Sequence, residues 1–450
     1  MNGNQPEKKQ DQENMTAEFL RDVENVVQDL QAAPRTEKPL TLAMRRRRGG
    51  TPFKDDTLVM TITERDGAFF VDQGIQMSRY GGARKRSPRA VLMGGKVIKD
   101  VPLARLDRNN IGQVLETLDQ KLTGNYGLHQ IKVDSLEPIN EFPQNGRVLL
   151  FIHGTFSKIE SLFAELQATP EGRDFLGRAN GHGYQQVLGF NHPTLSVSPI
   201  LNAQRLTNLI GNSKAHIDVI CHSRGGLVTR WWLEAFDRAD PTKRRVVFVA
   251  SPLKGTGLAA PTNLRASLSL IATMSNALKQ AGMLLSGTNP FLAFVTGVFQ
   301  IVASITNLAA KTPAIDAAIS LIPGLAAMSR VGNNQELLRL REHSIDLRKR
   351  YFAITSNFET EKVGWEFWKI FRRPKQKLLN RAADFVFDGD NDLVVDTSSM
   401  TNIGEKGKEE AIELPDDQVF KFGTNDRVHH TNYFRQPDTL NFITEKLQIP

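Results

Sequence analysis

The sequence predicts an α/β fold with a mostly parallel central sheet and helices on both of its faces. Three apolar runs are expected as strands: Arg147–Ile152, Ala215–Ile220 and Arg245–Ala250. They lack polar alternation, which is typical of strands buried on both faces. Helix-length segments separate them, and parallel strands need such crossover connections.

Other elements continue this alternation along the chain. Helices are expected at Ser161–Gln167, Ala203–Ile210, Leu227–Phe236 and Asp438–Leu447, and strands at Gln186–Phe190, Tyr351–Thr355 and Asp384–Phe387. We assign this α/β domain to residues 146–450. The preceding residues 57–145 are expected to form a strand-containing extension, with strands at Thr57–Ile62 and Ala90–Met93 and a helix near Ile111–Leu122.

The alternation is interrupted at residues 256–330 by a long, mostly apolar, helix-favouring insertion. Within it, residues 291–310 have about the length of a membrane span, so a transmembrane helix is one interpretation. Polar residues such as Gln300 and Asn307 in this stretch argue against it. We favour a helical lid packed over the site, with an amphipathic lid that touches lipid as a variant.

Composition limits the classes of partner. The 450 residues carry a net charge of +8, and residues 1–56 form a polar, basic tail that is expected to be disordered. Zinc-finger spacing and aromatic-interleaved basic motifs are absent, so no nucleic-acid partner is expected. Peripheral contact with a membrane through the lid and the basic residues stays open.

Two features bear on the compartment. Cys221 is the single cysteine, so no intramolecular disulfide can form, which is compatible with a reducing environment. The first residues are polar and lack the apolar core of a secretory signal. The sequence therefore predicts a cytoplasmic protein, although a peripheral membrane protein or one secreted without a signal would look the same.

Ser223 stands at the end of an apolar run, in the stretch Cys-His-Ser-Arg-Gly-Gly. A nucleophilic serine on a tight strand-to-helix turn needs small neighbours two positions before and after it. Gly225 meets this need, and Gly226 follows it. Cys221 occupies the other position, where glycine is usual, but its side chain is small. Ser223 is therefore our candidate nucleophile.

A second candidate element follows the strand Arg147–Ile152, where the chain reads His-Gly-Thr-Phe. Gly154 would allow the backbone to approach a substrate oxygen. The backbone N–H groups of Thr155 or Phe156, together with that of Arg224, would form an oxyanion hole.

A carboxylate and a histidine follow the serine in the order that a Ser-acid-His triad of this kind requires. Asp392 is our candidate acid, with Asp390 as the alternative, and His430 is our candidate base, with His429 as the alternative. Asp388, Asp390 and Asp392 also have the spacing of the first calcium ligands in a binding loop. Leu393 and Ser399 stand where that loop needs Gly and Glu, so no metal site is expected.

Together these motifs resemble the α/β-hydrolase superfamily of lipases and esterases. The match rests on CHSRGG, HGTF, ASPLKGTGLA after the next strand, and HHTNYF near the end, and it covers residues 145–450. The nearest groups are the inositol-deacylase-like and lecithin:cholesterol-acyltransferase-like lipases, which carry lids where this chain has its insertion. The resemblance implies the roles of Ser223, Asp392 and His430 as nucleophile, acid and base.

We therefore expect a serine hydrolase that cleaves carboxylic esters, with a lipid or long acyl chain as substrate, through an acyl-Ser223 intermediate. No cofactor is expected. Two alternatives use the same residues differently. One is an acyltransferase or an amidase with this triad, and the other is an inactive hydrolase scaffold that binds membranes or partners.

Overall fold

The computed structural model describes residues 57–65, 68–77, 84–86, 96–102, 111–259, 322–329, 334–342, 346–359, 390–406 and 410–450. These residues belong to two units, one holding those up to 118 and the other those from 119 onward. The expected tail, the strand at 90–93, most of the lid insertion and the strand at 384–387 lie outside the described residues.

The first unit contains a four-stranded antiparallel sheet. Its strands are β1 (Thr57–Arg65), β2 (Ala68–Met77), β3 (Arg84–Arg86) and β4 (Lys96–Pro102), in the order β3-β2-β1-β4. The central strand β1 is three residues longer than the Thr57–Ile62 run, because pairing with β2 continues to Arg65. Helix α3 (Ile111–Thr123) follows, and the boundary between the units falls within it.

The second unit is built on an eight-stranded sheet. Its strands are β5 (Gly127–Ile131), β6 (Leu136–Ile139), β7 (Arg147–Ile152), β8 (Gln186–Asn191), β9 (His216–His222), β10 (Arg244–Val249), β11 (Tyr351–Phe358) and β14 (Val419–Asn425). The order is β14-β11-β10-β9-β7-β8-β5-β6, with neighbours parallel from β14 to β8 and antiparallel from β8 to β6. This confirms the α/β-hydrolase fold class.

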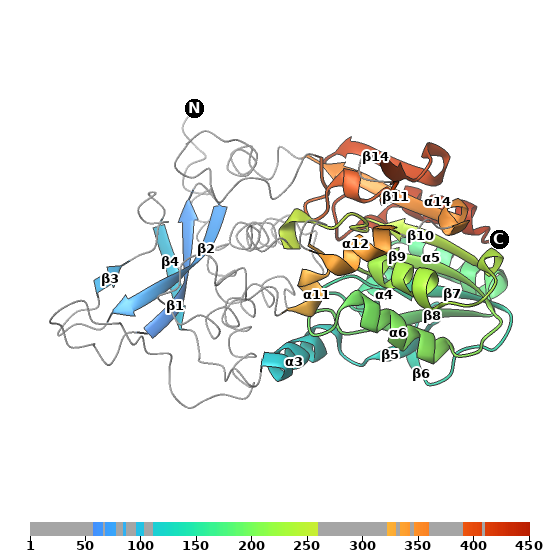
Figure 1. The fold of residues 1–450 in the computed structure, drawn as a ribbon, viewed down its shortest axis with the longest axis horizontal. Coiled ribbons are helices and arrows are strands. Elements are labelled where there is room, and N and C mark those ends of the chain that lie inside the picture. The colour runs from blue at the N-terminus through green and yellow to red at the C-terminus, as the bar shows by residue number, and fades with distance from the viewer. Residues whose placement is uncertain are drawn as a thin grey trace. The chain divides into compact units, whose positions relative to one another are not determined.

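Helices cover both faces of this sheet (Figure 1). One face packs against α4 (Ile159–Gln167), α5 (Pro170–Arg178) and α14 (Pro437–Leu447), and the other against α6 (Pro199–Ile210), α7 (Gly225–Trp231) and the π-helical turn η3 (Trp232–Phe236). Strand β7 shows why no polar alternation appears. Leu149 and Phe151 enter the first core and Val148, Leu150 and Ile152 the second, so every side chain after Arg147 is apolar.

Smaller elements complete the described part of this unit. They are α11 (Pro323–Ala326), α12 (Gln335–Glu342) and the hairpin of β12 (Asn402–Lys406) and β13 (Glu410–Glu413). The sheet itself begins at β5, inside the segment 57–145 that we expected as a separate extension. Strands β5 and β6 are four or five residues long and include His129, Gln130 and Glu137, so their sequence gives no buried-strand pattern.

The strand order reverses its direction at β7. The chain runs from β7 to β8 on one side of β7, then crosses to β9 on its other side and continues to β10 and β11. Connections that leave a parallel sheet in opposite directions open a crevice at the carboxyl ends of the strands. The turns after β7 and β9 meet at this point.

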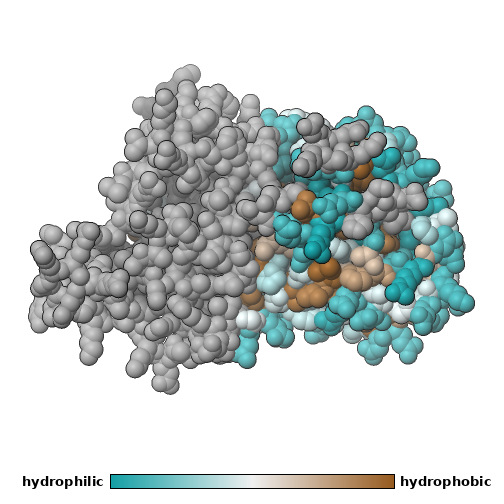
Figure 2. All heavy atoms as spheres, viewed as in Figure 1, coloured by the Kyte–Doolittle hydropathy of each residue, from teal (hydrophilic) through white to brown (hydrophobic). Residues whose placement is uncertain are grey.

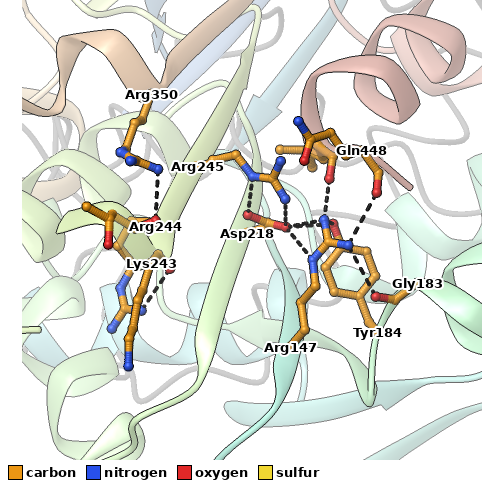
Figure 3. A network of polar contacts seen from close by, with 11 residues as sticks. Arg147, Gly183, Tyr184, Asp218, Lys243, Arg244, Arg245, Arg350 and Gln448 are labelled. Atoms are coloured by element: carbon orange, nitrogen blue, oxygen red, sulfur yellow. Dashed lines mark hydrogen bonds and ion pairs between the residues drawn. The ribbon is translucent and has the colours of Figure 1, made fainter. Parts of the chain in front are cut away.

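The opposite, amino-terminal end of the sheet is held by an ion-pair network around the buried Asp218 of β9 (Figure 3). Its carboxylate accepts hydrogen bonds from Arg147 of β7 at 2.8 Å, Arg245 of β10 at 2.9 Å and the Tyr184 hydroxyl at 2.9 Å. Arg147 also donates to the carbonyls of Leu447, the last residue of α14, and of Gln448, which follows it. Two guanidinium groups thus neutralise one buried carboxylate and tie three strands to the C-terminus.

Figure 2 shows that the visible surface of the described residues is mainly hydrophilic, with small apolar areas between the polar ones. Leu201 of α6 is the one large apolar side chain among them that is well exposed, at 54%. Within the described part of the chain, no helix combines the length and apolarity needed to cross a membrane. The stretch 291–310 lies outside that part.

Candidate active site

Ser223 occupies a sharp turn between β9 and α7. Its φ angle is 53°, a left-handed conformation that costs a non-glycine residue about 1–3 kcal/mol. The turn is held because the Ser223 N–H donates to the carbonyl of Val249 at 2.9 Å and the Ser223 carbonyl accepts from Gly226 at 2.9 Å. The strained residue is therefore the one that the sequence singled out as nucleophile.

The small residues around Ser223 are required by close backbone contacts. A Cβ on Gly225 would lie 2.3 Å from the Ile152 carbonyl oxygen, and one on Gly226 would lie 2.4 Å from Ser251 Oγ. Cys221 is fully buried, and burial raises the pKa of its thiol to about 12. It therefore acts as a small apolar residue beneath the turn, not as a thiolate.

The turn after β7 lies directly against the serine. A Cβ on Gly154 would stand 2.6 Å from Ser223 Cβ and 3.2 Å from Ser223 Oγ, so only glycine fits. His153 orients this turn: its Nδ1 donates to the Gly154 carbonyl at 2.8 Å, while its Nε2 accepts from the His192 N–H at 3.2 Å. Phe156 has a φ of 56°, which turns the chain sharply at the end of the motif.

The N–H groups expected to form the oxyanion hole lie on these two turns. Among the described residues, the backbone N–H groups of Thr155 and Arg224 donate to no protein acceptor. Donors without a partner, next to a strained serine, are suited to receive a developing negative oxygen. The Thr155 side chain is engaged in a different contact, because its hydroxyl donates to the Met328 sulfur at 3.2 Å.

The structure brings Asp392 and His430 together. His430 Nδ1 lies 2.8 Å from Asp392 Oδ2, and the fully buried carboxylate also accepts from the Tyr433 hydroxyl at 3.2 Å. Its other oxygen accepts from the N–H groups of Val394 at 3.1 Å and Val395 at 2.9 Å. Because both carboxylate oxygens act as acceptors in these four bonds, Nδ1 is the nitrogen of the neutral imidazole that carries the proton, and Nε2 carries the lone pair.

The two alternative residues lie elsewhere. Asp390 is exposed, and its backbone carbonyl accepts from Thr397 at 2.8 Å. His429 is buried, with Nδ1 near the Thr431 hydroxyl at 3.2 Å and its ring edge-on to Phe358. Neither side chain contacts the Asp392–His430 pair through a hydrogen bond in the described part of the chain.

Two further observations complete the geometry. Among the described residues, no hydrogen bond joins Ser223 Oγ to His430, and such bonds commonly form only in the substrate complex. The described residues contain no group of three or more side chains placed to hold a metal ion. Asp388 of the calcium-like spacing lies outside them, and both Asp392 oxygens already accept protein donors.

Asp119 is a residue that sequence reasoning missed. It is fully buried in α3 and accepts from the N–H groups of Thr194, Leu195 and Ser196 at 2.6–2.8 Å, and from two of their hydroxyls. It thereby shapes the turn after β8, beside the site. No sequence signal marks it, because its partners are 75 or more positions away.

The Arg224 side chain is also fully buried. It donates to the Val197 carbonyl, and burial lowers the pKa of its guanidinium to about 10 against the opposing effect of the Asp119 charge. Its Nε and Nη1 atoms have no partner among the described residues. The positive charge therefore lies in a low-dielectric region directly after the serine.

Four histidines near the site are held neutral by burial. It lowers the pKa of His153 and His222 to about 3, that of His429 to about 4, and that of His192 well below its usual value. In the unfolded chain each would titrate at about 6.5. Between these values the unfolded chain binds protons that the folded protein does not.

We therefore expect the free energy of unfolding to be highest above pH 6.5 and to fall as the pH is lowered toward 4. The slope is up to about 1.4 kcal/mol per pH unit for each such histidine. Urea unfolding at about pH 7 and about pH 5 measures the difference. Equal stability at the two pH values would contradict the assignment of buried, neutral histidines.

A protein family accounts for most of this chain. The family described as "Domain of unknown function (DUF7379)" matches residues 114–448. The chain belongs to this family. No curated protein matches it.

Two solved structures illustrate what the DUF7379 chain is similar to. Phospholipase PlaB from Legionella pneumophila aligns with a TM-score of 0.37 and 12% identity, over 67% of this chain and 60% of the phospholipase. Lipase 1 from Pelosinus fermentans aligns with a TM-score of 0.35 and 13% identity, over 67% of this chain and 99% of the lipase. The chain thus spans 60% of the length of the first of these proteins.

Proposed function

We propose that this protein is a serine hydrolase that cleaves carboxylic esters through an acyl intermediate on Ser223. The observation that supports this most is the Asp392–His430 pair, buried and joined at 2.8 Å, at the same end of the sheet as the strained Ser223 turn. An ionised acid that orients a neutral histidine is the arrangement that activates a serine hydroxyl.

The proposed reaction has two steps. His430 Nε2 accepts the proton of Ser223 as Oγ attacks the ester carbonyl carbon, and it then gives that proton to the departing alcohol. A water molecule attacks the acyl-serine next, with His430 again accepting a proton and returning it to Oγ. Asp392 stays ionised and stabilises the imidazolium in both steps.

Backbone donors would stabilise the tetrahedral intermediates. The N–H groups of Arg224 and of Thr155 or Phe156 are proposed to bind the oxyanion, and loss of one such donor costs about 3–4 kcal/mol of transition-state stabilisation. Gly154 permits this because its backbone lies against Ser223 without a side chain between them. No cofactor takes part in this scheme.

The substrate class is part of the proposal. The resemblance of CHSRGG, HGTF and HHTNYF to inositol-deacylase-like and lecithin:cholesterol-acyltransferase-like lipases favours a lipid or another long-chain acyl ester. The apolar composition of the insertion at 256–330 is compatible with a lid that contacts such a chain or a membrane surface.

The test is covalent labelling of the full-length protein with a fluorophosphonate probe, followed by peptide mapping. An activated serine reacts quickly, so we expect one adduct on the peptide that contains Ser223. Turnover of p-nitrophenyl esters of short and long chains, measured in parallel, examines the preference for long chains. A folded protein that stays unlabelled, even with detergent present, or an adduct on a different serine would overturn the proposal.

A further inference from the structure

His222, the last residue of β9, immediately precedes Ser223 and contacts the backbone of the proposed base. Its Nε2 lies 2.8 Å from the carbonyl oxygen of His430, and the two rings lie 4.8 Å apart, centroid to centroid. A carbonyl oxygen can only accept a hydrogen bond. Nε2 of His222 therefore carries a proton, and the contact is a directed N–H···O=C hydrogen bond.

Two further bonds hold His430, and Asp392 is the acceptor in both. The His430 N–H donates to the Asp392 carbonyl at 3.0 Å, and Nδ1 of its ring bonds to the Asp392 carboxylate at 2.8 Å. The backbone of His430 is thus fixed on its N–H side by the acid and on its carbonyl side by His222. Of these bonds, only the one from His222 comes from the strand that carries Ser223.

The charge state of His222 is suited to this contact. Burial is the main cause that lowers its pKa to about 3, and a charge on the neighbouring His430 lowers it further, while the hydrogen bond to the His430 carbonyl and the Asp392 charge have the opposite effect. His222 therefore stays neutral in the working enzyme. A cation at this position would oppose the positive charge that forms on His430 during catalysis.

We propose that His222 is a positioning residue that sets the distance between His430 and Ser223. It links the nucleophile strand directly to the backbone of the base, across 208 positions of sequence. A base displaced by even about 1 Å from its partner can cost roughly 100-fold in rate, so this contact controls how readily the proton leaves Ser223. The inference rests on the proposed serine-hydrolase function.

The test compares His222→Gln with His222→Met. The glutamine amide nitrogen reaches about as far as Nε2 and can still donate to the His430 carbonyl, whereas methionine has similar length and no donor. We expect His222→Met to lower kcat by about 10–100-fold with KM changed less than about twofold. We expect His222→Gln to stay within about threefold of the wild type, and fluorophosphonate labelling rates to follow kcat.

Ser213→Ala is the matched control. Ser213 lies before the opposite end of β9, and its hydroxyl donates to the Pro143 carbonyl at 2.6 Å. Its loss should lower the melting temperature without changing kcat, which separates positioning from general stability. If His222→Met does not fold, His222→Asn replaces it, because its shorter amide leaves the carbonyl without a donor.

The possible results distinguish a failure of the positioning role from a failure of the proposed hydrolase function. Equal kcat in His222→Met and the wild type, or an equal loss in the Gln and Met variants, would overturn the positioning role and leave the proposed hydrolase intact. A wild type that is neither labelled nor active would instead overturn the hydrolase proposal itself.

Discussion

Replacing Ser223 with alanine should abolish ester hydrolysis, lowering kcat by about 10⁴-fold or more. The substitution removes the single oxygen that is proposed to form the acyl intermediate. The fold should be unaffected. The bond that holds the turn runs from the backbone N–H of Ser223 to Val249, and no hydrogen bond from Oγ is present among the described residues.

Ser251→Ala is the matched control for this variant. Ser251 is fully buried, and its hydroxyl lies against Gly226 of the same turn. The Ser251→Ala substitution removes a hydroxyl near the site that has no role in the proposed reaction, so turnover should stay within a few-fold of the wild type. Hydrolysis of a p-nitrophenyl ester and the melting temperature should be measured for both variants. A folded Ser223→Ala protein that keeps a tenth or more of wild-type turnover would refute the acyl-serine mechanism.

The sharp turn at Ser223 could be predicted from the sequence because its constraints are local. Gly225 and the Cys221 position are needed within two residues of Ser223, and the apolar run before it marks the strand. The same holds for Gly154, which directly follows a buried strand. In each case, a close contact that excludes a larger side chain coincides with a local pattern in the sequence. For example, a Cβ on Gly225 would lie 2.3 Å from the Ile152 carbonyl oxygen.

Contacts between distant residues could not be predicted in the same way. Which of the two aspartates reaches His430 depends on how a loop folds 38 positions earlier in the sequence. The bond from His222 to His430 also joins distant residues, as do the hydrogen bonds that Asp119 accepts from residues 194–196. Polar side chains in such contacts follow no periodicity in the sequence. Strands β5 and β6 were missed for a different reason, since strands in the antiparallel part of a sheet need not be apolar on both faces.

Asp392→Asn should lower kcat by about 10⁴-fold, whereas Asp390→Asn should change it by less than about threefold. The backbone N–H groups of Val394 and Val395 would continue to bond to the asparagine oxygen. The amide NH₂ would then face His430 Nδ1, which could no longer donate to it. His430 would have to carry its proton on Nε2 instead and would lose the lone pair that accepts the serine proton.

The two variants are a close pair because they make the same chemical change two residues apart. Asp390 is exposed, so its loss tests only the charge of the loop. Turnover should be measured alongside melting temperature, because Asp392 also accepts from Tyr433 and some loss of stability is expected. A large loss in Asp390→Asn with near-normal turnover in Asp392→Asn would mean that the acid of the active enzyme is Asp390, and that the contact at 2.8 Å between Asp392 and His430 is structural.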